Sequence, residues 1–151
     1  MLHDTSIKEI SLEGFKVVSG DMFAHLPRKS EATCTLWPTA MSFSKQALIF
    51  LGNCEHIRIE VNAAKKGLLV VPVTTKDRDC VRWIKSIKNP TIRKMECCNF
   101  TRQLYETWGL NGELNYRAVG KLVTADNKVM LLFDFSNPES WKRVEAGGNR
   151  V

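Results

Sequence analysis

The sequence predicts an α+β fold, with a β-rich core made of two pseudo-symmetric strand–helix–hairpin units. In both halves of the chain, apolar runs on either side of a short polar turn indicate a β-hairpin. Ahead of each hairpin, a short stretch with the pattern of a helix ends at a glycine, Gly52 or Gly109. Glycine often closes a helix because it adopts the left-handed conformation without strain. We therefore expect residues 33–74 and 91–136 to form two similar units.

The first unit is expected to open with a strand and a helix. Apolar and small residues alternate over residues 33–37, and Pro38 then ends the strand because it lacks the N–H that a ladder needs. A short helix follows within residues 41–52. Ser42 and Ser44 are both suitable N-cap residues, because a serine hydroxyl can accept a hydrogen bond from the first turn.

A hairpin completes this unit. Residues 57–61 alternate between apolar and charged side chains, which is typical of a half-buried strand. Residues 62–67 have the composition of a turn, and residues 68–73 form an apolar run that contains Pro72. Because proline cannot donate to the ladder, we expect Pro72 at a sheet edge or near the end of its strand.

The second unit is expected to repeat the same order. A strand over residues 91–95 leads to a helix over residues 100–108. Two apolar strands, residues 116–124 and 128–135, then flank the polar turn 125–127 and predict a second hairpin.

Three further segments lie outside the two units. Residues 1–32 are expected to form a polar lead-in, in which residues 15–18 begin a short strand. Residues 75–90 are expected to be a basic linker between the units. Residues 137–151 are expected to be a C-terminal tail.

The two predicted units also match in sequence at an offset of 57 residues. The run Phe-Ser-Lys-Gln at 43–46 lies on Phe-Thr-Arg-Gln at 100–103, and Leu-Gly at 51–52 lies on Trp-Gly at 108–109. One helix and one hairpin cannot cover both faces of their own sheet, so two such units can pack around a pseudo-twofold axis. Chance remains the alternative, since many α+β chains contain two helix–hairpin units.

The same residues resemble the swapped-hairpin DNA-binding regulators of the AbrB type. The resemblance lies in a strand at 41–43, a helix at 47–52 that ends in Leu-Gly, and a hairpin at 57–61 and 68–73 with its proline. Two copies in one chain are similar to MraZ-like regulators. The pattern is also similar to small proteins of phages and mobile elements of Gram-positive bacteria. The resemblance implies a protein that binds double-stranded DNA and regulates transcription. Two like units in one chain would let a monomer be self-sufficient, whereas exposed edge strands would allow a homodimer.

Positive charge is concentrated in one part of the chain. The net charge is +6, and residues 76–103 contain eight basic and three acidic residues. Clustered lysine and arginine side chains neutralise phosphates, so the sequence favours a nucleic-acid partner. Trp83 lies in this region and offers a stacking surface, unless it anchors a solvated linker to the core. The expected phosphate contacts are Lys45, Lys76, Arg78, Arg82, Lys85, Lys88, Arg93, Lys94 and Arg102.

The sequence predicts neither an enzyme nor a metal or cofactor. It contains no glycine-rich phosphate loop, no nucleophile elbow and no zinc-protease motif. Five cysteines without C-x-x-C spacing are typical of buried thiols in a reducing compartment. The longest uncharged stretch, residues 32–44, is too short to span a bilayer. We therefore expect a cytoplasmic protein that has no contact with a membrane.

A second class of function remains open. The chain is small and lacks catalytic motifs, which also fits a non-enzymatic anti-defence protein of a phage or mobile element, such as an anti-CRISPR. Such an inhibitor would bind a host nuclease or another host protein. Aromatic residues often anchor protein interfaces, and the candidates here are Trp37, Trp83, Tyr105 and Trp141. A nucleotide pocket between the two units is a third possibility.

Overall fold

The computed structural model describes residues 7–19 and 31–143, and these residues form a β-rich fold with two short helices. Predictions for residues 1–6, 20–30 and 144–151 lie outside the described residues. The elements in chain order are β1 (Ala32–Leu36), β2 (Ala40–Phe43), α1 (Lys45–Phe50), β3 (His56–Asn62), β4 (Gly67–Val73), β5 (Val81–Arg82), β6 (Met95–Glu96), α2 (Cys98–Thr107), β7 (Leu114–Ala125), β8 (Lys128–Asp134) and β9 (Glu139–Lys142).

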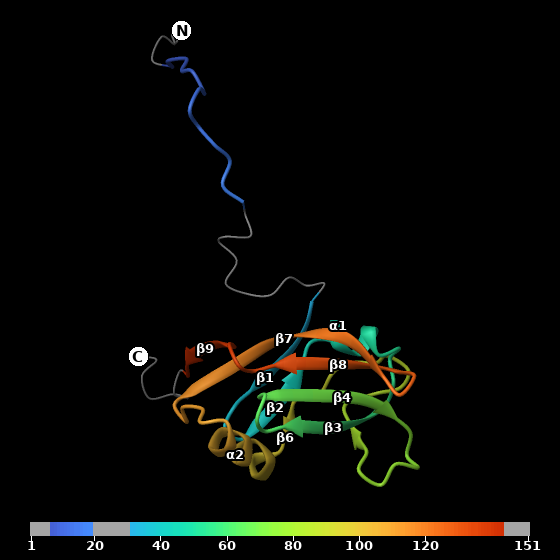
Figure 1. The fold of residues 1–151 in the computed structure, drawn as a ribbon. Helices are drawn as coiled ribbons and strands as arrows, with labels where there is room; N and C mark the ends of the chain where they lie inside the picture. The colour runs from blue at the N-terminus through green and yellow to red at the C-terminus, as the bar shows by residue number, and fades with distance from the viewer. Residues whose placement is uncertain (1–6, 20–30, 144–151) are drawn as a thin grey trace, which may run out of the picture.

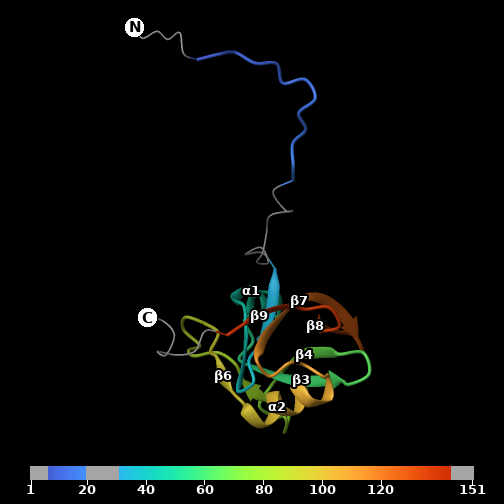
Figure 2. The ribbon, with the colours of Figure 1, turned by 90° about the vertical axis from the view of Figure 1, so that its left-hand side faces the viewer.

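All the strands belong to one antiparallel sheet that curls into a half-barrel (Figures 1 and 2). The strand order is β5-β3-β4-β8-β7-β1-β2-β6, and β9 adds to β7. A bridge between Ile84 and Ile92 joins the segment just after β5 to the segment just before β6. The two ends of the strand order are therefore brought close together, and the curl encloses the core.

Aromatic side chains fill the inside of the curl. The ring of Phe43 lies 5.3 Å from that of Trp83 and 5.6 Å from that of Phe133, measured between ring centroids. Each half of the strand order contributes to this group. Burial of such large apolar side chains is the main favourable contribution to folding, at about 1.5–3 kcal/mol for a fully buried phenylalanine.

Both expected hairpins are confirmed. β3 pairs with β4 from His56 to Asn62, and β7 pairs with β8 across a tight turn. In that turn Asp126 and Asn127 both have positive φ, of 51° and 64°, as a type I′ turn requires. Asparagine and aspartate tolerate this conformation better than other residues with a side chain, which explains why they occupy the turn.

The helix ends predicted at the glycines are also confirmed. Gly52 and Gly109 have φ of 70° and 67° directly after the ends of α1 and α2. At the start of α1, Ser44 has the N-cap position without capping the helix with its side chain. Its hydroxyl instead accepts a hydrogen bond from the Thr33 N–H at 2.9 Å and donates one to the Glu31 carbonyl at 3.3 Å. The serine therefore ties the helix start to β1.

The predicted boundaries were wrong in the second half. α2 begins at Cys98 rather than Phe100, and β6 contains only Met95 and Glu96, so the strand expected over residues 91–95 is shorter. The expected linker over residues 75–90 contains β5, because Trp83 is buried in the core and draws its neighbours into the sheet. The segment around Trp83 is rich in charged residues, so its packing against distant residues was not predicted.

Two terminal predictions were also wrong. Residues 15–18 have no strand partner and lie apart from the sheet (Figures 1 and 2). The expected tail returns to the sheet as β9, in which half-buried Glu139 and Trp141 alternate with exposed Ser140 and Lys142. An ion pair between Arg117 and Glu139, at 2.9 Å, holds β9 against β7.

Candidate nucleic-acid interface

A basic hairpin, defined as residues 81–94, carries the densest part of the predicted positive region. It contains five basic residues and no acidic residue. Its two arms are joined by the Ile84–Ile92 bridge and by a hydrogen bond from the Lys85 N–H to the Thr91 carbonyl at 2.9 Å. The five basic side chains are all exposed: Arg82, Lys85, Lys88, Arg93 and Lys94.

The root of the basic hairpin is fixed in the core. Trp83 is 0% exposed and Ile84 is also buried. The indole N–H of Trp83 donates a hydrogen bond to the Cys54 carbonyl at 2.8 Å, so this polar atom is satisfied. Because the root is buried and the cations are outside, the charges are presented from a defined position rather than from a loose linker.

The five cations differ in what surrounds them. Arg82 forms an ion pair with Glu55 at 3.1 Å, and Lys94 lies over the Trp37 ring at 4.5 Å from its centroid. Within the described part of the chain, Lys85, Lys88 and Arg93 have no ion-pair partner. These three side chains are therefore the cations most available to an external anion.

The other predicted phosphate contacts belong to elements outside the basic hairpin. Lys76 and Arg78 are exposed in the turn between β4 and β5. Lys45 belongs to α1 and Arg102 to α2, and the two helices lie on opposite sides of the sheet in both views (Figures 1 and 2). The predicted phosphate contacts therefore come from the basic hairpin, the β4–β5 turn and both helices.

Paired charges fix the turn that carries Lys76 and Arg78. Asp77 accepts a hydrogen bond from the Asp79 N–H at 2.8 Å and forms an ion pair with Arg58 of β3. The Asp79 N–H and the Arg58 guanidinium lower the pKa of the Asp77 carboxyl, because both favour its charged form. Part of the local positive charge is thus neutralised by internal partners.

Two of the four aromatic residues expected at the surface are buried. Trp83 belongs to the core, as its alternative interpretation predicted. Tyr105 is only 6% exposed, and its hydroxyl lies 2.8 Å from the Leu114 carbonyl and 3.2 Å from the Leu36 carbonyl. Burial raises the pKa of the Tyr105 hydroxyl. The expectation that these two residues are exposed interface anchors was therefore wrong.

The other two aromatic residues, Trp37 and Trp141, meet on either side of Asn115. In the amide orientation that satisfies both indoles, the Asn115 side-chain oxygen accepts hydrogen bonds from both indole N–H groups at 3.3 Å. Arg117 lies over the Trp141 ring at 4.9 Å from its centroid. This Trp37–Asn115–Trp141 cluster reaches the basic hairpin through Lys94. Nothing in the sequence around Asn115 indicated that this side chain would be buried between two indoles.

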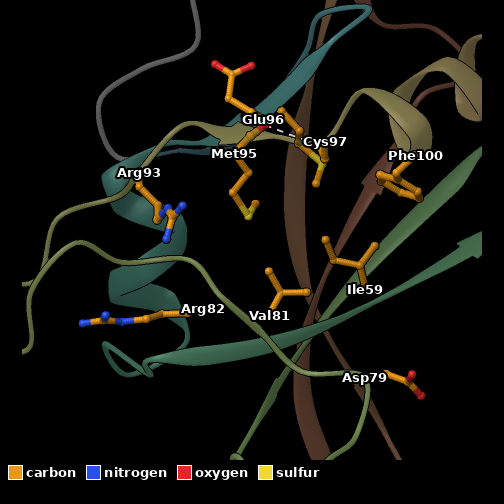
Figure 3. A pocket seen from close by; sticks show the side chains of 10 residues that line it. Ile59, Asp79, Val81, Arg82, Arg93, Met95, Glu96, Cys97 and Phe100 are labelled. Carbon is orange, nitrogen blue, oxygen red and sulfur yellow. Dashed lines mark hydrogen bonds between the residues drawn. The ribbon is translucent and has the colours of Figure 1, made fainter.

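A cavity of about 480 Å³ lies beside the basic hairpin, between β5 and β6 (Figure 3). Apolar side chains from β2, β3, β5, β6 and α2 line it, whereas charged side chains lie toward its rim. Its walls come from both predicted units, where a nucleotide pocket was the third possibility, but the lining residues were not predicted because they lie far apart in the chain. The lining residues are Met41, Ile59, Asp79, Val81, Arg82, Arg93, Met95, Glu96, Cys97 and Phe100.

Other candidate chemistry is sparse in the described part of the chain. Over residues 7–19 and 31–143, no group of three or more histidine, cysteine, aspartate or glutamate side chains is placed to hold a metal ion. Burial raises the pKa of the Cys34 thiol, which also lies near Cys97. In the same residues, neither helix has the length and apolar character needed to cross a bilayer.

No family model, curated protein or solved structure matches the chain.

Proposed function

We propose that this protein is a DNA-binding regulatory protein of a phage or mobile element. It contacts the phosphates of double-stranded DNA through the basic hairpin. The single observation that carries the proposal is the placement of five exposed cations, without one acidic residue, on a hairpin whose root is buried. Anchored cations bind phosphates with less loss of side-chain and backbone freedom than cations on a flexible tail.

The proposal includes an architecture of two pseudo-symmetric units. Matching hydrogen bonds at an offset of 57 residues support it: the Asn53 N–H donates to the Leu48 carbonyl at 2.9 Å, and the Leu110 N–H donates to the Tyr105 carbonyl at 2.8 Å. The strands that hold the same place in the order of the two units also pair with each other, β2 with β6 and β4 with β8. Such pairing is what a pseudo-twofold axis between the units produces.

The first test is the salt dependence of binding to unrelated DNA duplexes. If all five cations contact phosphates, the slope of log K against log salt is about −4.5. The double variant Lys85→Glu with Lys88→Glu is expected to weaken binding to every duplex alike and to make the slope shallower by about two. Arg82 is left unchanged because reversing its charge would place two carboxylates together at Glu55.

The matched control changes the same number of charges elsewhere. Lys65→Glu with Lys142→Glu alters two exposed lysines outside the basic hairpin, on the β3–β4 turn and on β9. This control is expected to keep the slope of the unchanged protein, apart from a small effect of net charge. Equal loss of DNA binding in both double variants would remove the basic hairpin as the contact surface.

A second candidate function is inhibition of a host nuclease or other host protein. The Trp37–Asn115–Trp141 cluster favours it, because two half-buried indoles in fixed orientation suit an interface anchor. A partner retained from a nuclease-treated lysate should then be lost with Trp37→Ala and Trp141→Ala. The same partner should still bind the Lys85→Glu, Lys88→Glu variant, which separates this function from DNA binding.

A further inference from the structure

The N-terminal segment exposes an unusual amount of apolar surface. Residues 7–19 lie apart from the sheet, yet they contain six of the fourteen large apolar residues that are exposed in the described chain. Phe15 is 72% exposed and Val17 is 98% exposed. A turn precedes them, in which the Phe15 N–H donates to the Leu12 carbonyl at 3.1 Å. Residues 15–18 have the composition of a strand but no strand beside them.

The half-barrel has a seam between β5 and β6, which are the two ends of the strand order and do not pair with each other in the described residues. The arms of the basic hairpin pair at Ile84–Ile92, and the Arg93 N–H donates to the Trp83 carbonyl at 3.2 Å. Continuing this register would bring Val81 opposite Met95. Instead, these two residues lie on two sides of the 480 Å³ cavity, and Ile59 and Phe100 line it next to them (Figure 3).

Main-chain groups on both sides of the seam point into it. In an antiparallel ladder, residues alternate between those that bond to a given neighbour and those that face away from it. The Trp83 N–H bonds to the Glu55 carbonyl, so the register of β3 and β5 turns the peptide groups of Arg82 away from β3. On the other side, the Cys97 N–H bonds to the Thr39 carbonyl, so the peptide groups of Glu96 face away from β2.

We propose that residues 15–18 of the same chain dock into this seam as an added strand between β5 and β6. Phe15 and Val17 share one face of an extended segment and would fill the apolar cavity. Lys16 lies on the opposite face, toward a rim that carries Asp79 and Glu96 together with Arg82 and Arg93. Docking therefore covers apolar side chains on both partners and satisfies the open peptide groups.

The chain is long enough for this strand to come from its own molecule. From Val18 to Ala32 the backbone can span at most about 45 Å. The seam lies three strand spacings from β1, across β2 and β6, which is about 14 Å around the sheet. Even with the full length of β1 added, the path is shorter than the reach. A tethered segment also has a high effective concentration, which favours it over a second copy.

The test is amide hydrogen exchange on the full chain, resolved at Arg82 and Glu96. The variant Phe15→Asp with Val17→Asp removes the two side chains that enter the cavity. The control Ile7→Asp with Ile10→Asp makes the same changes at exposed apolar residues of the same segment. Exchange at Arg82 and Glu96 is expected to rise about tenfold or more in the first variant and to stay unchanged in the control.

Each other outcome overturns the proposal. Unprotected amides at Arg82 and Glu96 in the unchanged protein mean that no strand occupies the seam. Equal loss of protection in both variants means that Phe15 and Val17 are not the side chains that fill the cavity, which rejects the proposal. Protection that disappears on dilution assigns the seam to a second copy and rejects the intramolecular strand. Amides of β4 and β8 report the global fold, and their exchange is expected to stay constant in all variants.

Discussion

Replacement of Gly120 by alanine is expected to destabilise the protein through one steric conflict. Gly120 of β7 pairs with Phe133 of β8 and with Ala32 of β1. A Cβ atom at this position would lie 2.5 Å from Cε1, 2.8 Å from Cζ and 2.9 Å from Cδ1 of Phe133. The Phe133 ring is fully buried and packs on Phe43, so moving it away from the new Cβ would disturb the core.

The size of the effect follows from the cost of overpacking a core. Adding one carbon to a well-packed site usually costs about 1–3 kcal/mol. For a chain of this length, each kcal/mol lowers Tm by about 2–4 °C. Gly120→Ala is therefore expected to lower the free energy of unfolding by about 2 kcal/mol and Tm by about 6 °C.

Urea denaturation of a small set of variants tests this reasoning. Gly112→Ala is the control, because a Cβ at that position meets nothing within 4 Å. Its free energy of unfolding is expected to change by less than about 0.5 kcal/mol. Phe133→Leu shortens the opposing side chain, so Gly120→Ala should cost less in that background, as a double-mutant cycle would show. An equal cost in both backgrounds, or no cost at all, would refute the steric argument.

Three further predictions concern single side chains. Tyr105→Phe removes a buried hydroxyl that bonds to backbone carbonyls, and we expect a loss of about 1 kcal/mol in urea denaturation. With a thiol reagent followed by mass spectrometry, exposed Cys98 should react early, whereas Cys34 should react only on unfolding, since burial raises its pKa and blocks access. The pKa of Asp77 is lowered in the fold, so its carboxylate stabilises the protein above the unfolded pKa, and this contribution is lost as pH falls through the folded pKa. At neutral pH the unchanged protein should therefore have a higher Tm than Asp77→Asn. This difference should disappear in the acid range below about 4.

Local patterns were sufficient for the parts of the fold that local forces determine. Alternating side chains located β3, apolar runs beside polar turns located β4, β7 and β8, and the two glycines located the helix ends. Each signal reflects a backbone or burial preference within a few residues. The positive charge of the basic hairpin was also visible in the sequence. The sequence did not indicate that this segment is an anchored hairpin, because the residues around Trp83 include many charged ones although its indole is buried in the core.

Long-range pairing accounts for what the sequence did not reveal. Residues 139–142 looked like a tail because their apolar content is low, yet Trp141 packs beside Asn115 and returns the chain to β7. The cavity at the seam is likewise formed by residues from five different elements. Such contacts depend on partners far away in the chain, and no window of neighbouring residues contains that information.

The way in which β1 and β5 find their partners has a consequence for how the chain folds. β1 pairs with β7, and β5 pairs with β3, so Ala32 meets Gly120 across 88 positions of the chain. The part of the chain before the β4–β5 turn lacks β7, the neighbour of its first strand β1. The part after the turn lacks β3, the neighbour of its first strand β5. Folding should therefore be slow, on a timescale of milliseconds to seconds, because the sheet is complete only after these distant strands have paired. Proteolytic nicking of the β4–β5 turn should leave two fragments that stay associated under native conditions and lose their structure when separated.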